Sequence, residues 1–177
     1  YYTKLLHSGN ATLRILFLDT TPLINRYRNE NDIYPDASKQ DRLKELDWID
    51  ETLKNAKEDW IICVGHHPIY ADTGKDKEER TDMQKYLLPM LHKYSNVAIY
   101  ACGHIHNFQH IKKTGDNIDY VVNSSASLSR KKVANIEGTI FCSNDDGFSI
   151  IAASKKELKM YMINNKGEVI HTITKNK

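Results

Sequence analysis

Apolar and polar positions follow two different periods along the chain, and these periods predict strands and helices in alternation. A β-compatible apolar run covers residues 12–18 and ends at the turn-forming residues 19–22. Two shorter apolar runs, at 60–64 and 97–101, have no polar interruption. Continuous apolar runs of this length are typical of strands that are covered on both faces. The pattern therefore predicts three central strands.

A helical period fills the intervals between these strands. Residues 25–36 show neither period and are expected to form a loop, whereas leucine and isoleucine recur every three or four residues over 39–57. Ser38 is expected to cap this first helix. A polar loop over 70–80 is expected before a second helix over 81–94, whose first residues have the capping-box spacing.

The order of these elements predicts an α/β fold. The segment 60–101 reads strand, helix, strand, and a helical crossover makes its two strands parallel. After residue 106 the pattern changes to short β-like runs at 108–112, 119–123, 147–153, 157–163 and 168–173. We therefore expect a single partial domain over 1–177, with a βαβ part over 12–106 and an antiparallel meander over 107–174.

Composition and charge limit the partners that are expected. The 177 residues are 40% hydrophobic and 27% charged, and 25 basic residues against 23 acidic ones leave a net charge of +2. This balance gives no electrostatic reason to expect nucleic acid. No apolar run approaches the roughly 18 residues of a membrane span, so a membrane partner is not expected either. The three cysteines, Cys63, Cys102 and Cys142, are expected to be free thiols.

Two of the predicted strands end at a glycine that is followed by histidine. His66 and His67 follow the strand over 60–64, and His104 and His106 follow the strand over 97–101. Because the carboxyl ends of parallel strands meet at one edge, we expect His66, His104 and His106 to converge there as metal ligands. On extended chain, residues 104 and 106 would face the same side; in a turn they would diverge and serve two neighbouring ions. His67 is expected to face packing or a pocket wall.

The blocks 65–70 and 103–107 resemble the last two signature blocks of the calcineurin-like metallophosphoesterases, and most closely those of the purple (tartrate-resistant) acid phosphatases. The similarity covers about residues 12–174. It implies a four-layer αββα sandwich, of which this chain would be the C-terminal half. It also implies a two-metal centre whose bridging hydroxide attacks a phosphoester, and it favours an extracytoplasmic location.

The resemblance also assigns the metal ligands. It implies that His66 and His104 bind the divalent ion and that His106 binds the other, usually ferric, ion, so that iron would be paired with zinc, manganese or a second iron. Lys75 stands near the position of a substrate-contacting histidine. Its ammonium could attract phosphate, or it could belong to a solvated charged loop over 75–80.

The remaining signature blocks of the family, which supply the carboxylates and a catalytic histidine, lie before this stretch and are not in the chain. We therefore expect the N-terminal half of the domain to be absent. Three imidazoles do not hold two ions in the geometry of the family. The chain alone is accordingly expected to be inactive and to bind metal weakly or not at all.

Three functions fit these observations. The first is the C-terminal fragment of a binuclear phosphoesterase that hydrolyses phosphomonoesters. The second is a non-catalytic half-fold that serves in binding or oligomerisation, because half of a sandwich exposes apolar surface through which it could self-associate. The third is a single zinc ion held by His66, His104 and His106, as in mononuclear hydrolases.

Overall fold

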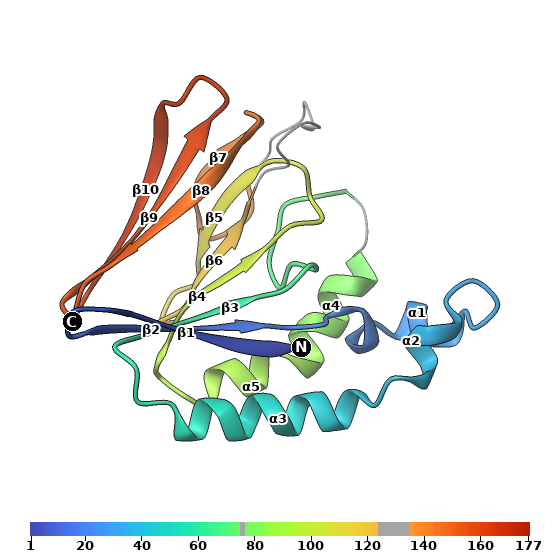
Figure 1. The fold of residues 1–177 in the computed structure, drawn as a ribbon. Helices are drawn as coiled ribbons and strands as arrows, with labels where there is room; N and C mark the ends of the chain where they lie inside the picture. The colour runs from blue at the N-terminus through green and yellow to red at the C-terminus, as the bar shows by residue number, and fades with distance from the viewer. Residues whose placement is uncertain (75–76, 124–134) are drawn as a thin grey trace.

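A computed structural model describes residues 1–74, 77–123 and 135–177 and arranges them in layers around one large sheet (Figure 1). The strands of this seven-stranded sheet are, in spatial order, β1 (Tyr2–Ser8), β2 (Ala11–Phe17), β3 (Trp60–Val64), β4 (Val97–Cys102), β6 (Asp119–Val122), β5 (Phe108–Lys112) and β7 (Thr139–Ser143). A second sheet of three strands contains, in order, β10 (Val169–Asn176), β9 (Glu157–Asn164) and β8 (Gly147–Ala153).

The centre of the large sheet is parallel. Strands β2, β3, β4 and β6 run in the same direction, and β1, β5 and β7 pair with their neighbours in the opposite direction. The expected α/β fold with a parallel core is therefore confirmed. An antiparallel meander was expected over 107–174, but β6 within it pairs in parallel with β4 and lies between β4 and β5. All four residues of β6 are buried, as a central position in a covered sheet requires.

The helical segments lie in the two crossovers between the parallel strands. They are η1 (Thr21–Leu23), α1 (Asn25–Asn29), α2 (Pro35–Lys39), α3 (Arg42–Asn55), α4 (Lys77–Tyr86) and α5 (Leu88–His92). In Figure 1, α3 and α5 run along the face of the large sheet that the second sheet leaves free. Within the described residues, no helix is long and apolar enough to cross a membrane.

Several expected boundaries were wrong. Residues 25–36 are not a loop, because they contain α1 and the start of α2. Helix α3 begins after Asp41, whose carboxylate accepts hydrogen bonds from the backbone amides of Leu43 and Lys44, so Asp41 and not Ser38 is the cap. The second crossover helix does not start at Thr81, because Lys77–Arg80 already form the first turn of α4.

Two edge strands were missed in the sequence. Strand β1 is exposed on both faces, and its aromatic Tyr2 stacks on Phe17 of β2 at a centroid distance of 4.7 Å. Strand β7 is only partly buried. Neither strand shows a clean apolar alternation, because an edge strand can pair by its backbone without burying one side-chain face.

The core has two parts, one on each face of the large sheet. Alternate residues of a strand face opposite sides, so Ile61 and Cys63 of β3 pack against the helices, whereas Trp60 and Ile62 face the three-stranded sheet. The helices contribute Ile49, Leu53, Met83 and Leu91 to the first part, together with Leu87 between α4 and α5. The small sheet contributes Leu158, Met160, Met162 and Ile173 to the second part. The central strands are thereby fixed from both sides.

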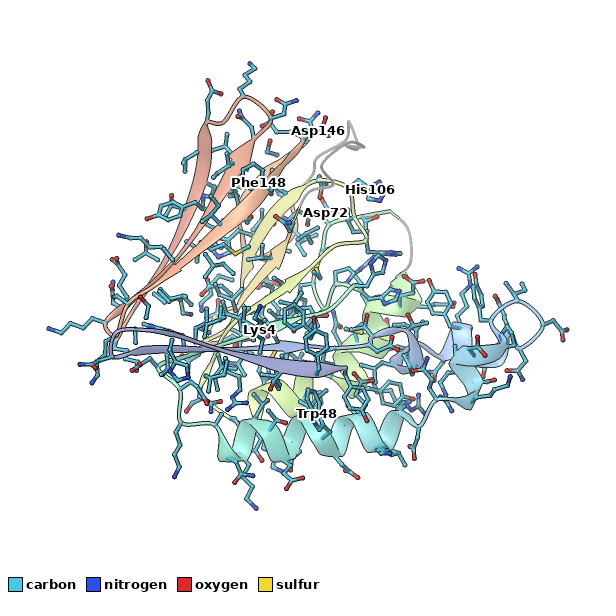
Figure 2. The ribbon with its side chains drawn as sticks, viewed as in Figure 1. Lys4, Trp48, Asp72, His106, Asp146 and Phe148 are labelled. Carbon is cyan, nitrogen blue, oxygen red and sulfur yellow. The ribbon has the colours of Figure 1, made fainter. Side chains whose placement is uncertain are left out.

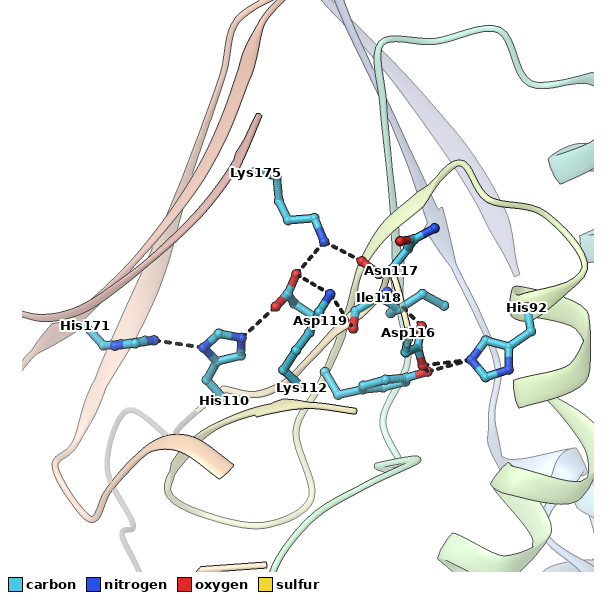
Figure 3. A network of polar contacts seen from close by, with 10 residues as sticks. His92, His110, Lys112, Asp116, Asn117, Ile118, Asp119, His171 and Lys175 are labelled. Atoms are coloured by element: carbon cyan, nitrogen blue, oxygen red, sulfur yellow. Dashed lines mark hydrogen bonds and ion pairs between the residues drawn. The ribbon is translucent and has the colours of Figure 1, made fainter. Parts of the chain in front are cut away.

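A buried polar network also joins the two sheets (Figure 3). Its centre is the Asp119 carboxylate of β6, which lies 2.8 Å from Nε2 of His110 on β5 and 2.5 Å from Nζ of Lys175 on β10. The other ring nitrogen of His110 lies 2.9 Å from Nε2 of His171 on β10. Burial alone would raise the pKa of Asp119, but the bonds from His110 and Lys175 hold it at about 2.

Candidate metal centre

Three loops meet at the carboxyl edge of the parallel strands. Thr20 follows β2, His66 and His67 follow β3, and His104 follows β4. Backbone hydrogen bonds connect these loops, from Gly65 N to Ala101 O at 3.0 Å and from Gly103 N to His66 O at 3.1 Å. The loops are therefore held in register by the strands that precede them.

The imidazoles of His66, His67 and His104 form one cluster. One ring nitrogen from each residue lies within 4.8 Å of the other two. His66 is exposed, His67 is buried and His104 is partly buried, so the cluster opens to solvent on the His66 side. The closest pair is His66 Nε2 and His104 Nδ1, at 3.0 Å. The structure thus brings together two of the three histidines that were expected to bind metal.

A buried carboxylate lies behind His104. Glu79 of α4 places Oε2 2.9 Å from His104 Nε2, a close contact without the alignment of a regular hydrogen bond. The other carboxylate oxygen accepts a 2.7 Å hydrogen bond from the hydroxyl of Tyr27. A histidine that binds a metal through one ring nitrogen commonly has a carboxylate at the other. Glu79 therefore faces Nε2 of His104, and Nδ1 is the ring nitrogen that faces His66.

His67 is held from two sides by buried hydroxyl groups. Its carbonyl oxygen accepts a 2.7 Å hydrogen bond from the hydroxyl of Tyr100. Its ring Nδ1 lies 2.8 Å from Oγ1 of Thr20, which also accepts hydrogen bonds from the backbone amides of His66 and His67. His67 was expected to face packing or a pocket wall; it is buried, and its ring is also one of the three in the cluster.

His106 lies outside this cluster. The chain from Gly103 to Asn107 makes two successive tight turns, from Ile105 N to Gly103 O and from Asn107 N to Ile105 O, both at 2.7 Å. His104 takes the left-handed conformation, with φ of 66°. In such a turn, side chains two residues apart diverge. Figure 2 shows His106 on the same side of the molecule as Asp72, and its role as a ligand remains a prediction.

The surroundings favour the neutral form of two of the clustered rings. Partial burial of its ring lowers the pKa of His66, and the nearby His104 lowers it further. Burial, together with the neighbouring His66 and His104, lowers the pKa of His67 to about 3. A neutral imidazole has a free lone pair on one ring nitrogen, and this is the form that binds a metal ion.

The donor set fits a transition-metal ion. Two nitrogens bound to one tetrahedral zinc ion, each at about 2.0–2.1 Å, lie roughly 3.3 Å apart. His66 Nε2 and His104 Nδ1 are 3.0 Å apart, so a small outward movement would suffice. Among the described residues, the carboxylate of Glu79 contacts His104, at the ring nitrogen that faces away from His66. The two imidazoles therefore fit one ion, whereas a second ion needs further ligands.

Lys75 lies outside the described residues, so its phosphate contact remains a prediction.

Glu79 was not predicted as a site residue, because the sequence was interpreted as a charged loop over 75–80. A signal was present, since Glu79, Met83 and Tyr86 share the three-to-four-residue spacing of one helical face. Extending the helical period towards the N-terminus would have brought Glu79 to the buried side of α4.

Comparisons with known proteins agree with this site. The calcineurin-like phosphoesterase family matches residues 3–108. The mouse tartrate-resistant acid phosphatase type 5 is 28% identical over 175 residues, which cover 90% of this chain and 51% of that protein. Purple acid phosphatase 3 of Arabidopsis thaliana is 27% identical over 170 residues, which cover 89% of this chain and 45% of the relative.

Solved structures show the same fold. The structure of GAP50, described as the anchor in the inner membrane complex of Plasmodium, superposes with a TM-score of 0.76 at 25% identity and covers 99% of this chain and 53% of its own. PhoD superposes with a TM-score of 0.67 at 12% identity and covers 99% of this chain and 42% of its own. The chain spans about half the length of the curated relatives that it matches. With residues 3–108 matched and the histidine cluster at the carboxyl edge of its parallel strands, the chain belongs to the calcineurin-like phosphoesterase family, with purple acid phosphatases among its homologues.

Proposed function

We propose that this chain is the C-terminal part of a binuclear metal-dependent phosphoesterase that hydrolyses phosphomonoesters, as an acid phosphatase does. The 3.0 Å approach of His66 Nε2 to His104 Nδ1, with Glu79 behind His104, carries the proposal. This is the imidazole side of a metal site, placed where α/β sheets bind their ligands. His106, which lies outside the cluster, would serve the second ion.

The metals would polarise the phosphate oxygens and lower the pKa of a bound water. The chain's own residues would position the ions: His66 and His104 would bind through Nε2 and Nδ1, and Glu79 would fix the ring of His104. We propose iron with zinc, manganese or iron as the pair, and an extracytoplasmic location, on the family resemblance alone. We also propose that the 177 residues by themselves are inactive or nearly so.

The decisive experiment starts from the reading frame upstream of Tyr1. We expect it to encode the carboxylate blocks and the Gly-Asn-His block, and we expect the longer product to hydrolyse an aryl phosphate monoester. His104→Ala should then abolish hydrolysis and lower the metal content measured by elemental analysis. The proposal is wrong if the longer product carries no such blocks, hydrolyses no aryl phosphate and keeps its metal content in the variant.

An exposed apolar patch favours a second candidate, a non-catalytic binding or oligomerisation module. Phe148 and Ile150 of β8 and Val169 of β10 are 51%, 48% and 56% exposed on the three-stranded sheet. Ile163 of β9 lies between Phe148 and Val169 in the register, so the apolar residues are neighbours. Patches of this kind commonly mark interaction surfaces.

Light scattering after size-exclusion chromatography tests this candidate. A module that self-associates through the patch elutes as a dimer or larger species, and Phe148→Ser with Ile150→Thr should convert it to a monomer. A matched control is Ile33→Thr, because Ile33 is 65% exposed away from this sheet. A monodisperse monomer of the unmodified chain at high concentration would count against self-association.

A further inference from the structure

The hydroxyl of Thr20 has three partners within hydrogen-bond distance. Its oxygen lies 3.2 Å from the backbone nitrogen of His66, 3.1 Å from the backbone nitrogen of His67 and 2.8 Å from Nδ1 of the His67 ring. A hydroxyl group has two lone pairs and one proton to donate. Both backbone nitrogens are donors, so they occupy the two lone pairs.

This count fixes the direction of the third bond. The only remaining capacity of the Thr20 hydroxyl is its proton, which must be donated to Nδ1 of His67. Nδ1 is then an acceptor without a proton of its own. An imidazole whose Nδ1 carries no proton is neutral and has its single proton on Nε2, so the three contacts of Thr20 assign the tautomer of His67.

The position of His67 is fixed as firmly as its tautomer. Its carbonyl oxygen accepts a hydrogen bond from Tyr100, its backbone amide donates one to Thr20, and the residue is 2% exposed. A metal bound through Nε2 would require the proton on Nδ1, where it would face a hydroxyl oxygen whose lone pairs are already in use. Metal binding by His67 would therefore break one of the two hydrogen bonds that the backbone amides of His66 and His67 donate to the Thr20 hydroxyl.

We infer that His67 is not a metal ligand but a fixed Nε2–H donor, set by Thr20, for a phosphoryl oxygen bound at the His66–His104 pair. The identity of this ligand rests on the proposed function; the tautomer does not. The inference separates His67 from the two imidazoles beside it, although all three meet the distance requirement for one metal ion. It also adds a neutral hydrogen-bond donor to a site otherwise described by its metal ligands.

Nitrogen-15 NMR of the histidine rings tests the tautomer without any metal. We expect the two ring nitrogens of His67, assigned by their loss in His67→Phe, to show a protonated Nε2 and an unprotonated Nδ1. Thr20→Ser keeps the hydroxyl and should preserve this pattern, whereas Thr20→Val removes it and should give a mixture of tautomers. A ring protonated on Nδ1 in the unmodified protein would overturn the inference.

Titrations separate metal binding from phosphate binding. With zinc as the probe, His67→Phe should leave the affinity within about twofold, whereas His66→Ala should lower it by about tenfold or more. With inorganic phosphate added to the zinc-loaded protein, His67→Phe should weaken binding by roughly tenfold. His67→Gln, which offers an amide N–H near the same place, should restore most of it.

Two results would contradict the inference: zinc affinity in His67→Phe as low as in His66→Ala, or phosphate affinity in His67→Phe equal to that of the unmodified protein. A failure of the proposed function gives a different result, namely no hydrolysis of aryl phosphate by the longer product. That failure would leave the tautomer and both titrations unchanged, so the two ideas are distinguishable.

Discussion

Glu79 Oε2 and His104 Nε2 lie 2.9 Å apart, which connects the first half of helix α4 to the turn after β4. The helix thereby orients an imidazole whose other nitrogen faces His66. A carboxylate in this place increases the basicity of a ligand and fixes its ring. The carboxylate of Glu79 should therefore contribute to the affinity of the site for metal.

Glu79→Gln should lower the zinc affinity of the protein by about tenfold or more, because the amide cannot replace the charge behind His104. The measurement is a calorimetric zinc titration. Glu78→Gln is the matched control, since Glu78 is exposed on the same turn of α4, and it should change the affinity by less than about twofold. Equal affinities in the two variants would exclude a role for Glu79 in the site.

Gly65→Ala should destabilise the loop that carries the histidines. A Cβ at Gly65 would lie 2.5 Å from Cγ2 of Thr20 and 2.7 Å from the hydroxyl oxygen of Tyr100, and both side chains are buried. We expect a loss of about 1–3 kcal/mol in the free energy of unfolding, measured by urea denaturation.

Gly74→Ala provides the control, because no atom lies within 4 Å of a Cβ at Gly74. It should change the free energy of unfolding by less than about 0.5 kcal/mol. If Gly65→Ala is equally harmless, the close approach of Thr20 and Tyr100 to Gly65 is not a constraint on this loop.

Asp119→Asn should destabilise the contact between the two sheets, because it leaves His110 and Lys175 without their carboxylate (Figure 3). Removing one partner of a buried ion pair costs about 3–5 kcal/mol. Urea denaturation measures the loss. Asp36→Asn is the control, since the side chain of Asp36 is 91% exposed, and a similar loss there would contradict the assignment.

The same carboxylate gives a pH dependence. The folded pKa of Asp119 is about 2, below the roughly 3.9 of an unfolded aspartate. Its contribution to stability is therefore complete above about pH 4 and is lost as the pH falls towards 2. From pH 5 to pH 2, the free energy of unfolding should fall more steeply for the unmodified protein than for Asp119→Asn. An equal fall in the two proteins would contradict this expectation.

Glu45 of α3 should give the stability a pH dependence of the opposite sign. It is buried, and burial raises its pKa to about 7, although the hydrogen bond from the Asp19 amide lowers it in part. The folded protein therefore holds this proton more tightly than the unfolded chain does. Stability linked to Glu45 is present below about pH 4 and falls as the pH rises to 7.

Glu45→Gln should remove this pH dependence, so that unfolding free energies of the variant change less between pH 5 and pH 8 than those of the unmodified protein. The exposed Glu51 on the same helix offers a matched control, Glu51→Gln, which should leave the dependence unchanged. An identical pH profile for all three proteins would show that Glu45 is ionised in the folded state at pH 5.

The parallel core and its carboxyl edge follow from the pattern of apolar residues along the chain. The uninterrupted apolar runs at 60–64 and 97–101 can only be satisfied by burial on both faces, and each ends at a glycine followed by histidine. Strand direction alone then places His66 and His104 at one edge. Both features depend only on local pattern and on the geometry of parallel strands, so the sequence is sufficient to predict them.

Which side chains meet at this edge depends on packing between elements that are distant in the chain. The two turns over Gly103–Asn107 and the left-handed His104 leave His106 outside the cluster, and no periodicity encodes such turns. Thr20 contacts His66 across a separation of 46 positions in the chain, and Glu79 contacts His104 across 25 positions. Contacts of this kind arise from packing between elements, so a residue's partner is fixed by the fold and not by its position in the sequence.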